Sequence, residues 1–152
     1  MLYKFIADVH LGRLARLLRM FGFDTAYKNT FTNSELASIA IEEERILLSR
    51  NAAFSKILQI KFIRIYHEEP QQQLKQVIDH FQLKNFFQPF TRCVVCNGTL
   101  IAVAKEKVLD KININAIRYF DEFWQCNTCD RIYWKGSHYD RMMDVIEELI
   151  KV

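Results

Sequence analysis

Short apolar runs alternate with amphipathic stretches along the first 84 residues of the chain. The apolar runs predict strands, at residues 2–7, 25–28, 45–49 and 62–66. Between them, apolar residues recur at three- and four-residue spacing, which predicts helices, at residues 11–21, 33–44, 52–58 and 70–82. Strands that alternate with helices favour a mainly parallel sheet with helices on both faces, so the sequence predicts an α/β fold.

The first predicted strand ends on Asp8, and the helix after it carries arginines. Arg13, Arg16 and Arg19 are spaced three residues apart, so we expect them to share one side of that helix. Gly22 follows as the expected C-cap. Because ligands of open α/β sheets bind at the carboxyl ends of the strands, Asp8 is predicted to lie at a functional edge of the sheet.

The composition changes after residue 84. Residues 85–92, which contain Pro89, are expected to link a first domain at residues 1–84 to a second unit at residues 93–152. Three features are expected in the second unit: short β-type runs within residues 99–124, a strand at 131–134, and a closing amphipathic helix at 138–152 with Met142, Val145, Ile146 and Leu149 on its apolar face.

Two Cys-x-x-Cys pairs are the sharpest chemical signal, at Cys93, Cys96, Cys126 and Cys129. Each pair can aim two thiolates at one ion, and two pairs supply the tetrahedral four-sulfur set that structural zinc prefers. Such a set leaves no open ligand position, so the predicted Zn²⁺ has a folding role rather than a catalytic one. A redox dithiol and unrelated core cysteines are the alternatives. His138 is a further candidate ligand, although four cysteines already suffice.

Asp8 is also the first candidate for a catalytic centre. Hydrolysis of a phosphodiester with a bound Mg²⁺ or Mn²⁺ needs several oxygen ligands around one point. Asn33 and Glu35, at the start of the second predicted helix, and Asn51, after the third predicted strand, could complete that set. Aspartate and asparagine are also typical helix caps, so capping is the structural alternative for Asp8, Asn33 and Asn51.

Four arginines could hold phosphates around Asp8, namely Arg13, Arg16, Arg19 and Arg50. A solvated helix face explains the first three equally well. The formal net charge of +3 permits binding to a polyanion without requiring it. No apolar run is long enough to cross a bilayer and no signal peptide is recognisable, so we expect a cytoplasmic protein with no membrane contact.

The sequence resembles the mut-seven C-terminal RNase domain family over nearly its whole length. The matching stretches are Phe5–Asp24, Ile46–Arg50, the two cysteine pairs and Tyr133–His138. The resemblance implies a PIN-like three-layer α/β/α domain followed by a zinc ribbon. It also implies metal-dependent cleavage of RNA and a structural zinc.

This chain departs from the family pattern at two positions. The family typically has an aspartate where Asn51 stands, and it tends to have one at or beside Asn33, whereas Asp8 matches and Glu35 lies close by in the sequence. A neutral amide offers one oxygen to a metal ion but lacks the negative charge that holds it. Weakened cleavage is therefore expected.

Three hypotheses follow from these patterns. The leading one is a PIN-like RNase that hydrolyses RNA with weakened activity. The alternative is a non-catalytic module that binds RNA or a protein and has kept the fold without the acids. The third, a zinc-ribbon interaction protein with no role on nucleic acid, is supported by fewer features.

Overall fold

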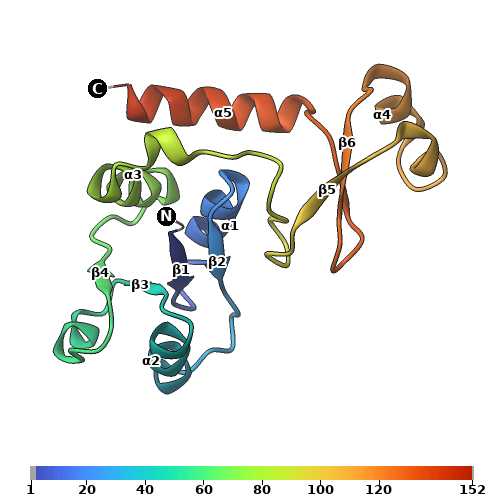
Figure 1. Ribbon diagram of the computed structural model, residues 1–152. Coiled ribbons are helices and arrows are strands. Elements are labelled where there is room, and N and C mark those ends of the chain that lie inside the picture. Colours follow the sequence, from blue (N-terminus) through green and yellow to red (C-terminus); the bar gives the residue numbers. More distant parts are fainter. Residues whose placement is uncertain (1–2, 152) are drawn as a thin grey trace.

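The computed structural model describes residues 3–151, with the side chains of residues 149 and 150 excepted (Figure 1). Two positions used in the sequence predictions, Leu2 in the first strand and Leu149 on the last helix, therefore lie outside the described side chains.

The first part of the chain forms a four-stranded parallel sheet. Its strands are β1 (Lys4–Ala7), β2 (Asp24–Ala26), β3 (Ile46–Ser49) and β4 (Phe62–Arg64), in the order β2-β1-β3-β4. Strands β1 and β3 are central and pair in parallel, with Ile6 opposite Leu47. The four predicted strands are confirmed, each somewhat shorter than its apolar run.

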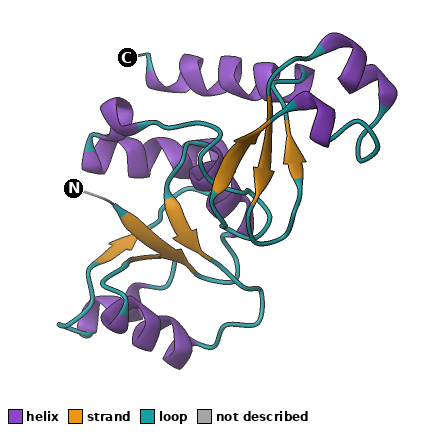
Figure 2. Ribbon diagram, turned by 45° about the vertical axis from the view of Figure 1, so that its right-hand side comes forward, coloured by secondary structure: helices purple, strands orange, loops and turns teal. Residues whose placement is uncertain are grey.

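Helices cover both faces of this sheet (Figure 2). Helices α1 (Gly12–Met20) and α3 (Pro70–Phe81) pack on one face, where Phe5, Leu14 and Leu48 belong to one buried cluster. Helix α2 (Asn33–Glu42) and the 3₁₀ helix η1 (Ala52–Lys56) pack on the other, against Ile6 and Leu47. The side chains of a central strand alternate between these two clusters, as strand geometry requires. The predicted α/β fold with three layers is confirmed.

Gly22 ends α1 as the sequence predicts. Its φ is +92°, and its N–H donates to Arg19 O at 2.9 Å while Phe23 N–H donates to Leu18 O at 3.0 Å. This pair of bonds is the Schellman arrangement, which satisfies the last carbonyls of a helix and needs a left-handed residue. A Cβ at Gly22 would lie 2.3 Å from Gln88 O, so the turn also lets the later segment pack closely.

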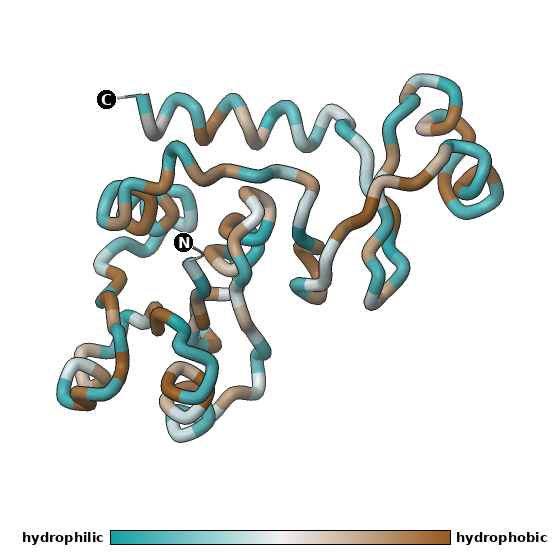
Figure 3. The backbone as a smooth tube through the Cα atoms, in the orientation of Figure 1, coloured by the Kyte–Doolittle hydropathy of each residue, from teal (hydrophilic) through white to brown (hydrophobic). Residues whose placement is uncertain are grey.

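The second part of the chain contains a three-stranded antiparallel ribbon in the order β5-β6-β7. Its strands are β5 (Leu100–Val103), β6 (Phe123–Cys126) and β7 (Ile132–Tyr133). The connection from β5 to β6 carries the 3₁₀ helix η3 (Lys105–Lys107) and helix α4 (Ile114–Tyr119), neither of which the sequence pattern predicts. In Figure 3 this connection protrudes and alternates hydrophobic and hydrophilic segments, and Ile114 is 70% exposed there.

Residues of the predicted linker at 85–92 pack against the end of α1. The 3₁₀ helix η2 (Leu83–Phe86) follows α3, and the Phe87 ring then lies 4.6 Å from the Phe21 ring. Gln88 N–H donates to Phe21 O at 2.8 Å. Residues 87 and 88 therefore hold the second part of the chain against the end of α1.

Helix α5 (Ser137–Ile150) closes the chain and lies beside α3 (Figure 1). Ile146 is fully buried and belongs to the same cluster as the residues of α1 and α3, with Met142 packed against it. The predicted amphipathic helix is thus present, and its apolar face covers the first part of the chain. Among the described residues, no helix is both long and apolar enough to cross a membrane.

Candidate functional site

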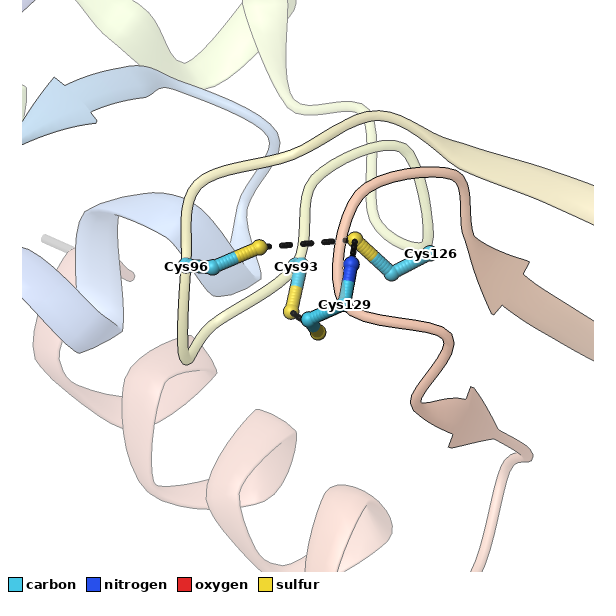
Figure 4. A group of neighbouring side chains, drawn as sticks. All are labelled: Cys93, Cys96, Cys126 and Cys129. Carbon is cyan, nitrogen blue, oxygen red and sulfur yellow. Dashed lines mark hydrogen bonds between the residues drawn. The ribbon is translucent and has the colours of Figure 1, made fainter.

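Four cysteine side chains converge between two turns. Cys93 and Cys96 lie on the turn before β5, whereas Cys126 ends β6 and Cys129 lies on the turn between β6 and β7. Their Sγ atoms all lie within 4.8 Å of one another, and Figure 4 shows the two turns bringing them to one centre. The cysteine spacing thus correctly predicts a cluster that could hold a metal ion such as zinc.

The sulfur–sulfur distances suit a tetrahedral ion. Cys93 Sγ lies 3.7 Å from Cys129 Sγ, and Cys96 Sγ lies 3.4 Å from Cys126 Sγ. A tetrahedron with metal–sulfur bonds of about 2.3 Å has edges of about 3.8 Å. All four cysteines are free thiols, so the structure contains no disulfide that would support a redox role for the pairs.

Backbone conformation at the two turns explains why their sequences suit the site. Asn97 and Asp130 follow the second cysteine of each pair with φ of +70° and +65°, a region that asparagine and aspartate tolerate better than most residues. Gly98 N–H donates to Cys96 Sγ at 3.4 Å, and a Cβ on Gly98 would lie 2.7 Å from Cys126 Sγ. Glycine is therefore the residue that fits at position 98.

Tyr133 from β7 supports the same cluster. The Tyr133 hydroxyl lies 3.0 Å from Cys93 Sγ. Burial alone would raise the pKa of the Cys93 thiol, but the hydrogen bonds from Tyr133 and from the backbone of Cys96 and Val95 lower that pKa to about 7. Burial raises the pKa of the Cys96 thiol. Four thiolates this close repel one another, so a cation is what would let all of them ionise.

Arg19 joins the first cysteine turn to the parallel sheet. It is only 4% exposed, and its guanidinium donates to Val94 O and Val95 O, each at 3.1 Å, and to Thr25 O at 2.9 Å. The expectation that Arg19 shares an exposed face with Arg13 and Arg16 is therefore wrong. Each three-residue step on a helix falls about 60° short of a full turn, so Arg19 lies about 120° around from Arg13.

Asn97 makes a second connection between the same turn and the sheet. Its side-chain amide donates to Asp24 Oδ1 at 2.7 Å and accepts from Thr25 N–H at 3.0 Å. Arg45 also donates to Asp24 Oδ1, at 2.8 Å. Burial would raise the pKa of the Asp24 carboxyl, but its hydrogen bonds to Arg45 and Asn97 hold that pKa below its usual value. The cysteine turn is thus bonded to β2 through a half-buried carboxylate.

Asp8 lies directly after the central strand β1, at the sheet edge that the sequence predicts. It is 6% exposed, and its Oδ1 accepts from His10 N–H at 2.8 Å while its Oδ2 accepts from the Ser49 hydroxyl. Ser49 Oγ in turn accepts from Asn51 N–H at 3.0 Å. Asp8, Ser49 and Asn51 therefore link the carboxyl ends of the two central strands. No pattern in the sequence marks Ser49 as the residue that joins them.

The other three candidates of the acidic centre have capping contacts or lie beside a cap. Asn51 Oδ1 accepts from Ala53 N–H at 3.0 Å and caps η1. Thr32, rather than Asn33, is the N-cap of α2, so the capping role expected for Asn33 is wrong. Glu35 completes a capping box, because its Oε1 accepts from Thr32 N–H at 3.3 Å and its N–H donates to Thr32 Oγ1 at 3.1 Å.

Within residues 3–151, the four cysteines form the one group of three or more metal-ligating Cys, His, Asp or Glu side chains that lie together. Asp8 and Glu35 therefore do not belong to a cluster of three acids. A carboxylate has about four acceptor sites, so Asp8 keeps lone pairs beyond its two protein bonds.

The remaining candidates lie on the surface. Arg13 and Arg16 are exposed on α1, and Arg50, also exposed, has its Nη2 3.8 Å from Glu68 Oε1. His138 is exposed at the start of α5 and is not part of the cysteine cluster. The expectation that four cysteines suffice without His138 stays a prediction.

One family model matches the sequence. The model of the Mut7-C RNAse domain family matches residues 3–146, nearly the whole length. No curated protein matches the sequence, and no solved structure matches it either.

Proposed function

The chain belongs to the Mut7-C RNAse domain family, and on that premise we propose that it acts on RNA by metal-dependent hydrolysis of the phosphodiester backbone, at a reduced rate. One observation carries this proposal: Asp8 lies at the carboxyl end of the central strand and is joined through Ser49 to Asn51 at the end of the next strand. Ligands of open parallel sheets bind at this edge.

The residues that would hold the catalytic ion are Asp8 and Asn51, with Asn33 and Glu35 at the start of α2 as further candidates. A bound Mg²⁺ or Mn²⁺ would supply an activated water and neutralise phosphate charge. Asp8 provides one full negative charge and Asn51 a neutral oxygen. Mg²⁺ gives up its hydration water reluctantly, whereas Mn²⁺ accepts a broader range of donors. The donor set therefore supports weak activity that favours Mn²⁺.

Ser49 and His10 orient the Asp8 carboxylate. The Ser49 hydroxyl holds Oδ2 and the His10 N–H holds Oδ1, so the side chain cannot rotate freely. The carboxylate is thus kept in one position at the mouth of the sheet, as positioning of a reacting group requires.

Arg13, Arg16 and Arg50 are proposed to contact RNA phosphates. All three are exposed, and two of them lie on the helix that begins just after Asp8. Arginine suits phosphate because its planar guanidinium can make two parallel hydrogen bonds.

The cysteine cluster is proposed to hold one Zn²⁺ with a folding role. Its donors are four sulfurs at distances close to a tetrahedral edge, and zinc is the ion for which this set is usual. The cluster is bonded through Val94, Val95 and Asn97 to the sheet. The ion would therefore stabilise the attachment of the ribbon as well as the ribbon.

A non-catalytic RNA-binding module is the second candidate. The capping bonds of Asn51 and Glu35 favour it, because each has a structural reason to be present without any metal. Both candidates predict binding of RNA, and they differ in whether Asp8 is needed for cleavage.

Cleavage of end-labelled single-stranded RNA, with Mg²⁺ and Mn²⁺ in parallel, tests the proposal. We expect slow cleavage that is faster with Mn²⁺ and is lost in Asp8→Asn, a variant of nearly the same shape. Equal cleavage by wild type and Asp8→Asn would place the activity elsewhere. Binding without any cleavage under either ion would favour the non-catalytic module.

A further inference from the structure

An aromatic pocket lies between the end of α1, the ribbon and the start of α5. Its volume is about 290 Å³, and its lining includes Met20, Phe90, Arg92, Trp134, His138 and Tyr139. None of the four cysteines lines it, and neither does Asp8. The pocket adjoins the cysteine cluster through Val94 and Tyr133, but it is lined by none of the proposed metal ligands.

Aromatic packing holds the Phe90 side of this pocket in place. The Phe90 ring stacks on Trp124 at 4.2 Å between centroids and lies 4.8 Å from Tyr139. Lys135 Nζ lies 5.8 Å from the centre of the Phe90 ring. Phe90 itself has a φ of +61°, which bulky residues rarely adopt and which is found preferentially at ligand sites.

Arg92 adds a polar group to the lining. Its Nη1 donates to Asn97 O at 3.0 Å, whereas its Nε is buried with no acceptor among the residues that the structure describes. A buried donor without an acceptor is costly. The aromatic lining favours a planar ligand, and the Arg92 Nε favours one that carries a hydrogen-bond acceptor. The Lys135 ammonium beside the Phe90 ring favours a ligand that carries negative charge.

Helix α1 connects this pocket to Asp8. Arg13, Arg16 and Met20 occupy positions i, i+3 and i+7 and so share one face of the helix. The two arginines are exposed, Met20 lines the pocket, and the helix begins four residues after Asp8. The helix has 9 residues and is about 13.5 Å long at about 1.5 Å per residue. A chain of phosphates along this face would run from the pocket toward the mouth of the sheet.

We infer that the pocket binds one unpaired nucleobase of an RNA strand whose phosphates lie on Arg16 and Arg13. The inference rests on the proposed function and names its substrate class, single-stranded RNA. The volume is at the small end of ligand pockets, which suits one base rather than a base pair. Unpaired bases are read by stacking on aromatic side chains and arginine planes, whereas a base within a duplex cannot reach such a pocket.

Tryptophan fluorescence offers a direct readout, because both tryptophans of the chain lie here. Trp134 lines the pocket and Trp124 stacks on Phe90. The probes are a short oligoadenylate, an abasic ribose-phosphate chain of the same length and the corresponding RNA duplex, in buffer without added Mg²⁺ or Mn²⁺. We expect the oligoadenylate to quench the fluorescence and to bind about tenfold more tightly than the abasic chain. The duplex should not quench.

Tyr139→Ala should weaken binding of the oligoadenylate about tenfold and leave binding of the abasic chain unchanged, because one stacking surface is removed. Tyr139→Phe retains the ring and should bind as wild type, which separates stacking from a folding defect. Tyr119→Ala is the matched control, since Tyr119 is 71% exposed on α4, remote from the pocket.

The outcomes separate this inference from the proposed function. Equal affinity for the oligoadenylate and the abasic chain, without quenching, would overturn the base pocket and leave the action on RNA intact. Equal quenching by the duplex would also overturn it. Failure of every RNA probe to bind would overturn both.

Discussion

The side-chain amide of Asn97 donates a hydrogen bond of 2.7 Å to the carboxylate of Asp24, across 73 residues of sequence. This bond attaches the first cysteine turn to β2, the edge strand of the parallel sheet. Thr25 N–H returns a bond to the same amide. The first cysteine turn and the sheet edge are therefore joined by hydrogen bonds. We expect the cysteine cluster to contribute in this way to the stability of the first part of the chain.

Asn97→Gly tests this attachment. Glycine keeps the left-handed backbone of position 97 and removes only the amide, leaving Thr25 N–H and Asp24 without that partner. We expect the free energy of unfolding to fall by about 1–3 kcal/mol, measured by urea denaturation. Asn29→Gly, at an exposed turn outside the helices and strands, is the control for a change of asparagine alone. An Asn97→Gly effect no greater than that of the control would show that the attachment contributes little.

The acid dependence of stability should report on Asp24. Its pKa in the folded protein lies below its usual value of about 4, so it contributes stability above the unfolded pKa that disappears as the pH falls through the folded one. Asp24→Asn should therefore be less stable than wild type at neutral pH, and the difference should shrink below about pH 4. Denaturant curves between pH 2 and pH 7 measure it. A difference that stays constant over this range would contradict the account.

One Zn²⁺ per chain is expected at the cysteine cluster. Cys126→Ser should lose the ion, since Cys126 is buried and its Sγ lies 3.4 Å from Cys96 Sγ. Elemental analysis of the purified protein gives the stoichiometry, and Thr128→Ala, beside the site but not in it, should keep the metal. Zinc far below one per chain in the wild type would refute the assignment.

Salt-dependent RNA binding is expected to depend on α1. Replacing Arg13 and Arg16 with alanine should weaken binding and reduce the slope of log affinity against log salt by about 0.7 for each phosphate that is no longer neutralised. Arg118→Ala, exposed on α4, should change neither. Arg19→Ala should instead lower stability, because its guanidinium bonds three backbone carbonyls. An unchanged slope in the double variant would place the RNA on another surface.

Local patterns in the sequence predicted much of the fold. Apolar runs predict the four parallel strands, and the spacing of the cysteines predicts the cysteine cluster that could hold a metal ion. The N-cap of α2 is Thr32 rather than Asn33, and Thr32 and Glu35 form the Ser/Thr-x-x-Glu pattern that marks a capping box. That signal was present in the sequence and identifies Thr32.

Interactions between distant parts of the chain could not be predicted from such patterns. Arg19 has the same spacing as Arg13 and Arg16, and only the packed turn at Val94 and Val95 makes it a buried residue. No apolar periodicity predicts helix α4, because its apolar residues do not form one covered face, as the exposure of Ile114 and Tyr119 shows. The aromatic pocket joins residues from α1, the ribbon and α5, which no local pattern brings together.

The charge at position 51 tests the central claim most directly. Aspartate caps a helix as well as asparagine does, so Asn51→Asp should keep the bond to Ala53 N–H and the fold. Its added charge should raise the rate of RNA cleavage with Mn²⁺ by about tenfold or more, if one extra ligand charge contributes about 1.4 kcal/mol. Asn115→Asp adds the same charge on remote α4 and should have no effect.

The decisive measurement is the cleavage rate of end-labelled single-stranded RNA by Asn51→Asp, alone and combined with Asp8→Asn. The account predicts faster cleavage by the single variant and disappearance of that increase in the double variant, because both side chains would hold the same ion. An Asn51→Asp protein that binds RNA and Mn²⁺ but cleaves no faster than wild type, or an increase that survives Asp8→Asn, would contradict a catalytic centre at Asp8.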